Sequence, residues 1–188
     1  MAYTTSDFRR GLKIEWEGKP YEILEYQHVK VSKNQPTVRT KLKDLLTGRV
    51  LEVNFRAGER FEKPDFMEKK AQFLYKEGNQ YVFMDLEEYD QIYVREDVIK
   101  EEARFLKENL VVSVLYYKGK IVGIELPNKV ELKVIETEPG VKGDTVGTAT
   151  KPAKLETGYV IQVPLFINEG DVIKVDTKTG KYIERVSK

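Results

Sequence analysis

The sequence predicts a mainly β protein built from three small β-barrels of about 60 residues each. Two observations support this prediction. Short stretches in which apolar and polar residues alternate recur along the chain of 188 residues, and Gly, Pro and Asn residues separate them. Only residues 96–107 have apolar residues clustered as on one face of a helix, with acidic residues early and Lys107 late.

The first third of the chain predicts a barrel of about five short strands. Four of its stretches alternate clearly, and turn-forming residues such as Gly18, Pro20 and Gly48 lie between them. These stretches are residues 12–16, 21–26, 38–43 and 50–55. The polar segment Glu62-Lys63-Pro64-Asp65 marks a boundary, so the first domain is predicted to span residues 1–64.

The rest of the chain divides into two further units. Residues 65–127 are predicted to form a middle domain, with hairpins at 71–84 and 110–126 and the helix between them. Residues 128–188 are predicted to form the third domain. Its expected elements are a strand at 129–137, a long loop at 138–158 and a hairpin at 171–186.

The composition excludes several classes of enzyme. The chain has no cysteine and a single histidine, His28, so it cannot build a disulfide framework, a thiolate metal site or a histidine metal cluster. It also lacks a Gly-Lys-Ser/Thr phosphate loop. The acidic residues Asp85, Glu87, Glu88 and Asp90 are predicted to form a solvated turn. We therefore predict no catalytic site, no metal site and no cofactor.

The N-terminal segment has neither a basic region nor an apolar run, so it does not look like a signal peptide. No segment approaches the roughly 20 apolar residues that a membrane helix needs. We expect a cytoplasmic protein that does not bind a membrane.

The net charge of +1 conceals an asymmetry along the chain. Residues 1–64 hold 13 Lys and Arg against nine acidic residues, whereas residues 65–127 hold nine against 13. Residues 128–188 are nearly balanced, with ten against nine. This separation indicates a polyanionic partner at the N-terminal end and a different partner for the acidic middle.

A basic segment follows the second predicted strand. Residues 28–49 contain six Lys or Arg residues and one acidic residue. Turn-forming neighbours place Lys33 at the tip of a hairpin, with Lys30 just before it. Arg39 and Lys41 alternate onto one face of the next strand. The pattern fits a solvated charged hairpin, or a phosphate-binding face with a lysine that reaches into an anionic cavity.

A second polar segment lies in the loop of the third domain. It contains Gly143, Asp144, Thr145, Gly147 and Thr148. Glycines permit sharp turns, and exposed amides and hydroxyls can hydrogen-bond unstacked bases or ribose hydroxyls. From the residues alone, the segment is either an ordinary wide loop or an RNA contact.

The C-terminal strand carries a third candidate pair. Alternation places Tyr182 on one face of this strand and Arg185 on the other. From the residues alone, Tyr182 covers the end of a barrel.

Taken in order, these motifs resemble bacterial elongation factor P over essentially the whole chain. The resemblance includes Val29-Lys30 before the tip, and Lys151-Pro152-Ala153 and Val163-Pro164 after the polar loop. The tip itself departs from the family, because the common Pro-Gly-Lys-Gly is Val31-Ser32-Lys33-Asn34 here.

The resemblance implies an SH3-like (KOW-type) barrel followed by two OB-fold barrels, in an L-shaped arrangement like that of tRNA. It implies a translation elongation factor, not an enzyme, that binds the ribosome between the P and E sites. There it would promote peptide-bond formation at stalled polyproline sequences by positioning peptidyl-tRNA.

The resemblance also assigns roles to the candidate residues. Lys33 would contact the CCA end of the P-site peptidyl-tRNA and could be post-translationally modified. Lys30, Arg39 and Lys41 would contact RNA phosphates, including those of ribosomal RNA. The loop at 143–148 would lie near the mRNA, and Tyr182 and Arg185 would contact tRNA. The acidic middle domain would face a basic ribosomal protein, and we expect the factor to be a monomer.

Two alternatives remain open from the sequence. One is the elongation-factor-P-like paralogue, which shares the fold but has a different tip. The other is a general single-stranded RNA-binding protein, which would show salt-sensitive binding to many RNAs without a requirement for Lys33.

Overall fold

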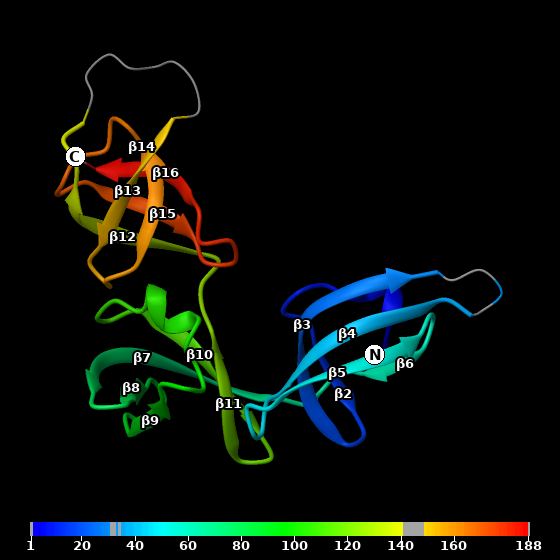
Figure 1. The fold of residues 1–188 in the computed structure, drawn as a ribbon. Helices are drawn as coiled ribbons and strands as arrows, with labels where there is room; N and C mark the ends of the chain where they lie inside the picture. The colour runs from blue at the N-terminus through cyan, green and yellow to red at the C-terminus, as the bar shows by residue number, and fades with distance from the viewer. Residues whose placement is uncertain (1, 31–32, 34, 141–148, 188) are drawn as a thin grey trace. The chain divides into compact units, whose positions relative to one another are not determined.

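The computed structural model describes residues 2–30, 33, 35–140 and 149–187. These residues form sixteen β-strands and two short 3-10 helices (Figure 1). The strands make one sheet of six strands and two of five, all distinct. The predicted mainly β architecture is confirmed. The boundaries of the three predicted domains and their L-shaped arrangement stay predictions.

The first sheet has the order β1-β6-β2-β3-β4-β5. Its strands are β1 (Ala2–Thr4), β2 (Lys13–Trp16), β3 (Lys19–Val29), β4 (Thr37–Asp44), β5 (Val50–Arg56) and β6 (Arg60–Glu62), with the 3-10 helix η1 (Thr5–Asp7) after β1. Its core is strongly aromatic, and Phe55 packs against Phe8, Trp16 and Phe61. The same core includes Ile23 of β3 and Leu42 of β4, so it holds the two strands that carry the tip against the rest of the sheet.

The second and third sheets have the orders β11-β10-β7-β8-β9 and β14-β13-β12-β15-β16. The second comprises β7 (Met67–Glu77), β8 (Gln80–Asp85), β9 (Gln91–Arg95), β10 (Val111–Tyr117) and β11 (Lys120–Glu125). The third comprises β12 (Lys129–Thr137), β13 (Thr150–Leu155), β14 (Val160–Pro164), β15 (Val172–Asp176) and β16 (Tyr182–Ser187).

The prediction of a helix at residues 96–107 is wrong. The segment begins with turns, including one closed by the hydrogen bond from Val98 N–H to Arg95 O, and then forms the 3-10 helix η2 (Glu102–Phe105). Phe105 is 1% exposed and belongs to the core of the third sheet. The apolar spacing therefore reflects tertiary packing, which outweighs helix propensity in so short a segment.

The prediction of a long loop at residues 138–158 is also wrong in part, because β13 lies within this range. Lys151, Ala153 and Leu155 are buried along one face of this strand. The sequence conceals this alternation, since its first buried residue is a lysine and Pro152 is unusual inside a strand.

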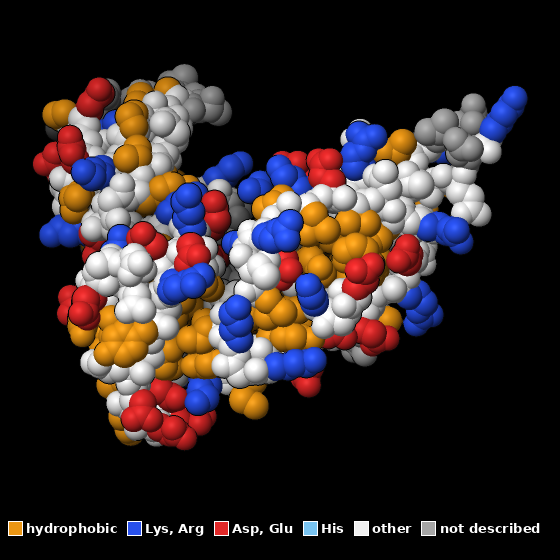
Figure 2. Space-filling view, turned by 60° about the horizontal axis from the view of Figure 1, so that its bottom comes forward, with side chains coloured by type: hydrophobic (Ala, Val, Ile, Leu, Met, Phe, Trp, Pro, Cys, Tyr) orange, Lys and Arg blue, Asp and Glu red, His pale blue; other side chains and the backbone are white. Residues whose placement is uncertain are grey.

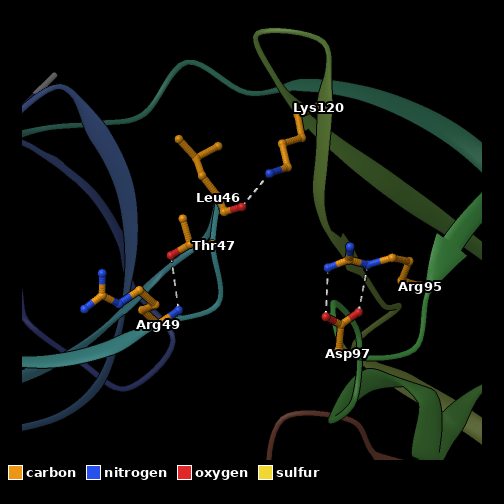
Figure 3. Close-up of polar contacts among 6 residues, drawn as sticks. All are labelled: Leu46, Thr47, Arg49, Arg95, Asp97 and Lys120. Atoms are coloured by element: carbon orange, nitrogen blue, oxygen red, sulfur yellow. Dashed lines mark hydrogen bonds and ion pairs between the residues drawn. The ribbon is translucent and has the colours of Figure 1, made fainter.

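The chain divides into two compact units. The first comprises residues 1–68 and 115–123, and the second comprises residues 69–114 and 124–188. In the first unit the hairpin at 115–123 packs its apolar residues against Leu45, Leu46 and Phe66. The Lys120 ammonium donates a hydrogen bond of 2.5 Å to Leu46 O (Figure 3).

A buried tyrosine adds a second polar contact inside the first unit. The Tyr117 hydroxyl donates a hydrogen bond of 2.8 Å to the Glu15 carboxylate. This bond, together with burial, raises the pKa of Tyr117 above its ordinary value. The hairpin is thus fixed to β2 and to the turn that follows β4.

In the second unit, the segment around η2 is tied to the third sheet. The Arg104 guanidinium lies 4.6 Å from the centre of the Tyr159 ring and donates a hydrogen bond of 3.1 Å to its hydroxyl. The Thr157 hydroxyl donates to Arg104 O at 2.7 Å. With Phe105 in the same core, η2 and the third sheet form one packed body.

None of the helices in the described part of the chain is long and apolar enough to cross a membrane.

Candidate nucleic-acid interface

The tip of the β3–β4 hairpin presents Lys33 to solvent. Lys33 is exposed, lies in a turn and has a φ of 78°, in the left-handed region that non-glycine residues rarely adopt. The last strand pair before the tip is Val29 with Thr37, so Lys33 extends beyond the sheet. Lys30 is also exposed. The predicted position of Lys33 at a hairpin tip is confirmed, and its contact with the CCA end stays a prediction.

The strand after the tip separates its residues cleanly onto two faces. Val38, Thr40 and Leu42 are fully buried, whereas Arg39 is exposed and Lys41 is half-buried on the opposite face. This is the alternation that the sequence predicted. Both basic residues therefore point away from the aromatic core, on the outer face of β4.

The outer face ends in a polar hollow of about 710 Å³ near the tip. Residues from the tip end of the β4–β5 pair and from the turn after β5 line it, namely Gln35, Thr37, Asn54, Arg56, Ala57, Gly58 and Glu59. In Figure 2, blue Lys and Arg side chains lie at the right-hand end of the first unit. The hollow thus offers amide, hydroxyl and guanidinium groups beside the tip.

The second candidate is the polar loop of the third domain. Gly143, Asp144, Thr145, Gly147 and Thr148 all lie outside the described residues, so their predicted contact with mRNA stays a prediction.

Both legs of this loop are described, and side chains tie them together. The Thr137 hydroxyl donates a hydrogen bond of 2.9 Å to Pro152 O, and the Lys151 ammonium donates one to Glu138 O. Lys151 is only 4% exposed, although it is a lysine. An ammonium in such a site needs its hydrogen bond, so Lys151 serves as a structural tie.

One leg also requires a glycine. Gly140 N–H donates a hydrogen bond of 2.6 Å to Asn168 Oδ1. A Cβ at position 140 would lie 2.7 Å from that oxygen and 2.9 Å from Phe166 O. Asn168 is held in turn by Asp171, whose carboxylate accepts its N–H at 2.8 Å. Close backbone approach therefore fixes this leg against the turn before β15.

The third candidate pair already has partners inside the protein. The Arg185 guanidinium lies 5.2 Å from the centre of the Phe166 ring and 3.7 Å from the buried carboxylate of Asp171. Tyr182 is half-buried against the core of the third sheet, and burial raises its pKa. Each residue therefore supports the fold, and their contact with tRNA stays a prediction.

The acidic turn between β8 and β9 is only partly as predicted. Glu87, Glu88 and Asp90 are exposed, but Asp85 is 3% exposed, so its assignment to a solvated turn is wrong. Its carboxylate accepts the backbone N–H groups of Glu87 and Glu88, at 2.8 and 3.3 Å. These bonds hold the pKa of Asp85 below its ordinary value, with a smaller contribution from Lys69. Asp85 thus organises the turn.

Sequence reasoning missed several residues of these regions. Asn54 and Arg56 belong to the hollow, yet Asn54 looked like a polar position of an ordinary strand and Arg56 lay just beyond the strand predicted at residues 50–55. The segment from Asn168 to Asp171 could have been noticed, because Asn, Gly and Asp in four residues are typical of a turn held by side chains. In the described residues no group of three or more His, Cys, Asp or Glu could hold a metal ion.

Comparison with known families decides what this arrangement belongs to. Three family models match in succession: the elongation factor P KOW-like domain at residues 4–61, its OB domain at 66–124 and its C-terminal domain at 130–185. The chain belongs to the elongation factor P family. The KOW-like domain and the first of the two OB domains that the resemblance implied are therefore present, and the family is one of translation elongation factors and not of enzymes.

Individual relatives in the elongation factor P family match over nearly their whole length. Elongation factor P of Thermodesulfovibrio yellowstonii is 55% identical over 97% of this chain and 98% of its own. Elongation factor P of Maridesulfovibrio salexigens is 56% identical, again over 97% of this chain and 98% of its own. That of Aquifex aeolicus is 53% identical over 95% of this chain and 93% of its own. Membership of the family implies the ribosome as a partner.

A solved structure of eukaryotic translation initiation factor 5A from Methanococcus jannaschii aligns with 64% of this chain and 90% of its own. Its TM-score is 0.46 and its sequence identity is 19%. At this level of similarity the family assignment rests on the sequence matches.

Proposed function

We propose that the protein binds the ribosome between the P and E sites and promotes peptide-bond formation at stalled polyproline sequences by positioning peptidyl-tRNA. The observation that carries this proposal is the placement of Lys33. Its ammonium extends beyond the last pair of the β3–β4 ladder, on a hairpin whose outer face is basic near the tip. A point charge on such a projection suits a narrow cavity lined by RNA.

The proposed mechanism is positional. Proline is a poor nucleophile, and its ring restricts the nascent chain, so the reactants are held badly. A factor that braces the CCA end of the peptidyl-tRNA restores the reacting geometry, and alignment can lower a barrier by several kcal/mol. Lys33 supplies the brace, while the bonds that form and break remain those of the ribosome and its substrates.

The remaining candidate regions complete the binding surface. Lys30 and Arg39 lie toward phosphates of tRNA or ribosomal RNA, and the loop at 143–148 lies toward the mRNA. Tyr182 and Arg185 lie toward tRNA. The exposed acids after Asp85 suit a basic ribosomal protein. The factor acts in the cytoplasm as a monomer and needs no cofactor.

The exposed position of Lys33 also suits post-translational modification. Its primary amine is accessible on a turn, so an enzyme can reach it without unfolding the sheet. A group added to the amine would lengthen the reach of the side chain toward the peptidyl-transferase centre. Mass spectrometry of protein purified from its own cells tests this, and an unmodified Lys33 would contradict it.

The experiment that tests the function is reconstituted translation of a message with three consecutive proline codons. The protein is expected to shorten the time to full-length product on this message and to leave a proline-free message unchanged. Equal times with and without the protein on the triple-proline message would overturn the proposal.

A second candidate function is that of the elongation-factor-P-like paralogue, because the tip Val31-Ser32-Lys33-Asn34 departs from the common family sequence. The same assay separates the two. A protein that associates with ribosomes but does not speed passage through prolines would support the paralogue.

A further inference from the structure

The outer face of the β3, β4 and β5 strands has two halves of different charge. Each residue of β4 on this face lies directly opposite one residue of β3 and one of β5. Near the tip, the two cross-strand rows are Val29–Thr37–Arg56 and Gln27–Arg39–Asn54, which we call the tip rows. Farther from the tip, the rows are Glu25–Lys41–Glu52 and Glu22–Lys43–Val50, which we call the base rows.

The two pairs of rows have opposite net charge. The tip rows contain Arg39 and Arg56 and no acidic residue, which gives +2, whereas the base rows contain two lysines and three glutamates, which gives −1. Directly opposite residues in an antiparallel pair have Cβ atoms about 4.5–5.5 Å apart, so their charges interact. Lys41 thus lies between two carboxylates, and a phosphate that approaches it also approaches Glu25 and Glu52.

The neighbours of Arg39 act differently. Gln27 and Asn54 are neutral amides, which donate and accept hydrogen bonds without opposing a phosphate. Arg39 is exposed and presents a planar fork that can bind a phosphate through two hydrogen bonds. The row therefore combines one phosphate-binding group with two groups that can read the edge of a base.

The polar hollow adjoins these rows. Asn54, Thr37 and Arg56 belong both to the tip rows and to its lining. Its one acidic residue, Glu59, accepts a hydrogen bond of 3.3 Å from the Arg56 backbone N–H, which draws that carboxylate toward the turn. The volume of about 710 Å³ lies within the range of sites that hold small molecules, so the hollow has room for one unpaired nucleotide.

We propose that the tip rows and the adjoining hollow form a binding site for one unpaired nucleotide of RNA. Arg39 and Arg56 hold its flanking phosphates, and Asn54 and Gln27 hydrogen-bond its base or ribose. Lys41 and Lys43 contribute less than Arg39 and Arg56, because each of the two lysines lies directly opposite at least one glutamate. This inference rests on the proposed function, in which the tip approaches the end of a tRNA.

Four single substitutions test the proposal, in two matched pairs. Arg39→Gln and Arg56→Gln remove a charge from the tip rows, and Lys41→Gln and Lys43→Gln remove one from the base rows. The measurement is the affinity of each full-length variant for ribosomes with peptidyl-tRNA in the P site, at several salt concentrations. Thermal unfolding of each variant shows that the fold is retained.

The tip-row variants are expected to bind about fivefold more weakly at 0.1 M salt. The slope of the logarithm of the binding constant against the logarithm of the salt concentration should become less steep by about 0.7, because each contact with a phosphate of single-stranded RNA contributes that much. The base-row variants should change affinity less than twofold, because the opposing glutamates already reduce the field there. Equal losses in the two pairs, or a larger loss in Lys41→Gln, would overturn the division of the face.

A fifth variant tests whether the site holds a nucleotide and not only a phosphate. Asn54→Leu preserves size and charge but removes the amide, so it should weaken binding and leave the salt slope unchanged. Unchanged affinity would overturn the nucleotide part of the proposal.

The proposed function can fail separately. If wild-type protein does not speed passage through three prolines, that function is wrong, while a loss of affinity confined to the tip-row variants would still support the site. If wild-type protein is active and the two pairs behave alike, the function stands and the site is wrong.

Discussion

The β3–β4 hairpin and the β12–β13 loop both hold predicted RNA contacts, but different interactions support them. Lys33 lies on a turn beyond the last ladder pair of its hairpin. The legs of the β12–β13 loop are instead joined by side chains, through Thr137 with Pro152 and Lys151 with Glu138, and Gly140 is bonded to Asn168. The hairpin therefore exposes the charged side chain of Lys33 to solvent, while the side chains at the legs of the β12–β13 loop fix the backbone there.

This difference separates function from stability. Substitution at the hairpin tip removes an exposed group that contributes little to the core, so it should change activity and leave unfolding unaffected. Substitution at the legs of the loop disturbs buried polar contacts and close packing, so it should change stability first. The predictions that follow run from the largest expected effect to the smallest.

Lys151→Ala should lower the free energy of unfolding by about 3 kcal/mol, because it leaves Glu138 O without its partner and removes a buried aliphatic stem. Lys154→Ala on the exposed face of the same strand is the control and should change it by less than about 0.5 kcal/mol. Urea unfolding measures both. Equal effects would show that Lys151 is not a structural tie.

Gly140→Ala should cost about 2 kcal/mol, since its Cβ would lie 2.7 Å from Asn168 Oδ1 and 2.9 Å from Phe166 O. Gly123→Ala is the matched control, because no atom lies within 4 Å of a Cβ built there. Thermal unfolding of both variants gives the comparison. A Gly140→Ala protein as stable as Gly123→Ala would mean that the leg can shift freely.

Tyr117→Phe should cost about 1 kcal/mol, because it removes the hydrogen bond to Glu15 that ties the hairpin at 115–123 to β2. The pKa of Tyr117 is raised in the folded protein, so the bond stabilises the fold below the ordinary tyrosine pKa of about 10. That contribution is lost as the pH rises through the folded pKa. Wild-type protein should therefore lose more stability than Tyr117→Phe above pH 10.

The pH comparison uses chemical unfolding at several pH values between 7 and 11. Parallel curves for the two proteins would contradict the assigned hydrogen bond.

The sequence was sufficient to predict most strands, because apolar alternation reports burial directly. Val38, Thr40 and Leu42 are buried in alternation, and Lys33 lies on a turn, as expected. It failed where tertiary contacts reverse the usual role of a residue. Lys151 and Asp85 are charged yet buried, and Phe105 is buried in a core formed by strands distant in sequence.

The division of the β4 outer face shows a second limit. Arg39 and Lys41 are equivalent in the sequence, since both alternate outward in a basic segment. Only the register shows that Lys41 lies opposite two glutamates and Arg39 opposite two amides. Register depends on the bulge between Ile23 and Glu25, which no local pattern specifies.

The most direct test of the tip's role compares Lys33→Ala with Lys100→Ala, another exposed lysine, in translation through three prolines and in thermal unfolding. Lys33→Ala should slow passage about tenfold, a loss of about 1.4 kcal/mol of positioning, with an unchanged unfolding temperature. Lys100→Ala should match wild type in both measurements. Full activity in Lys33→Ala, or loss of its unfolding transition, would contradict the account.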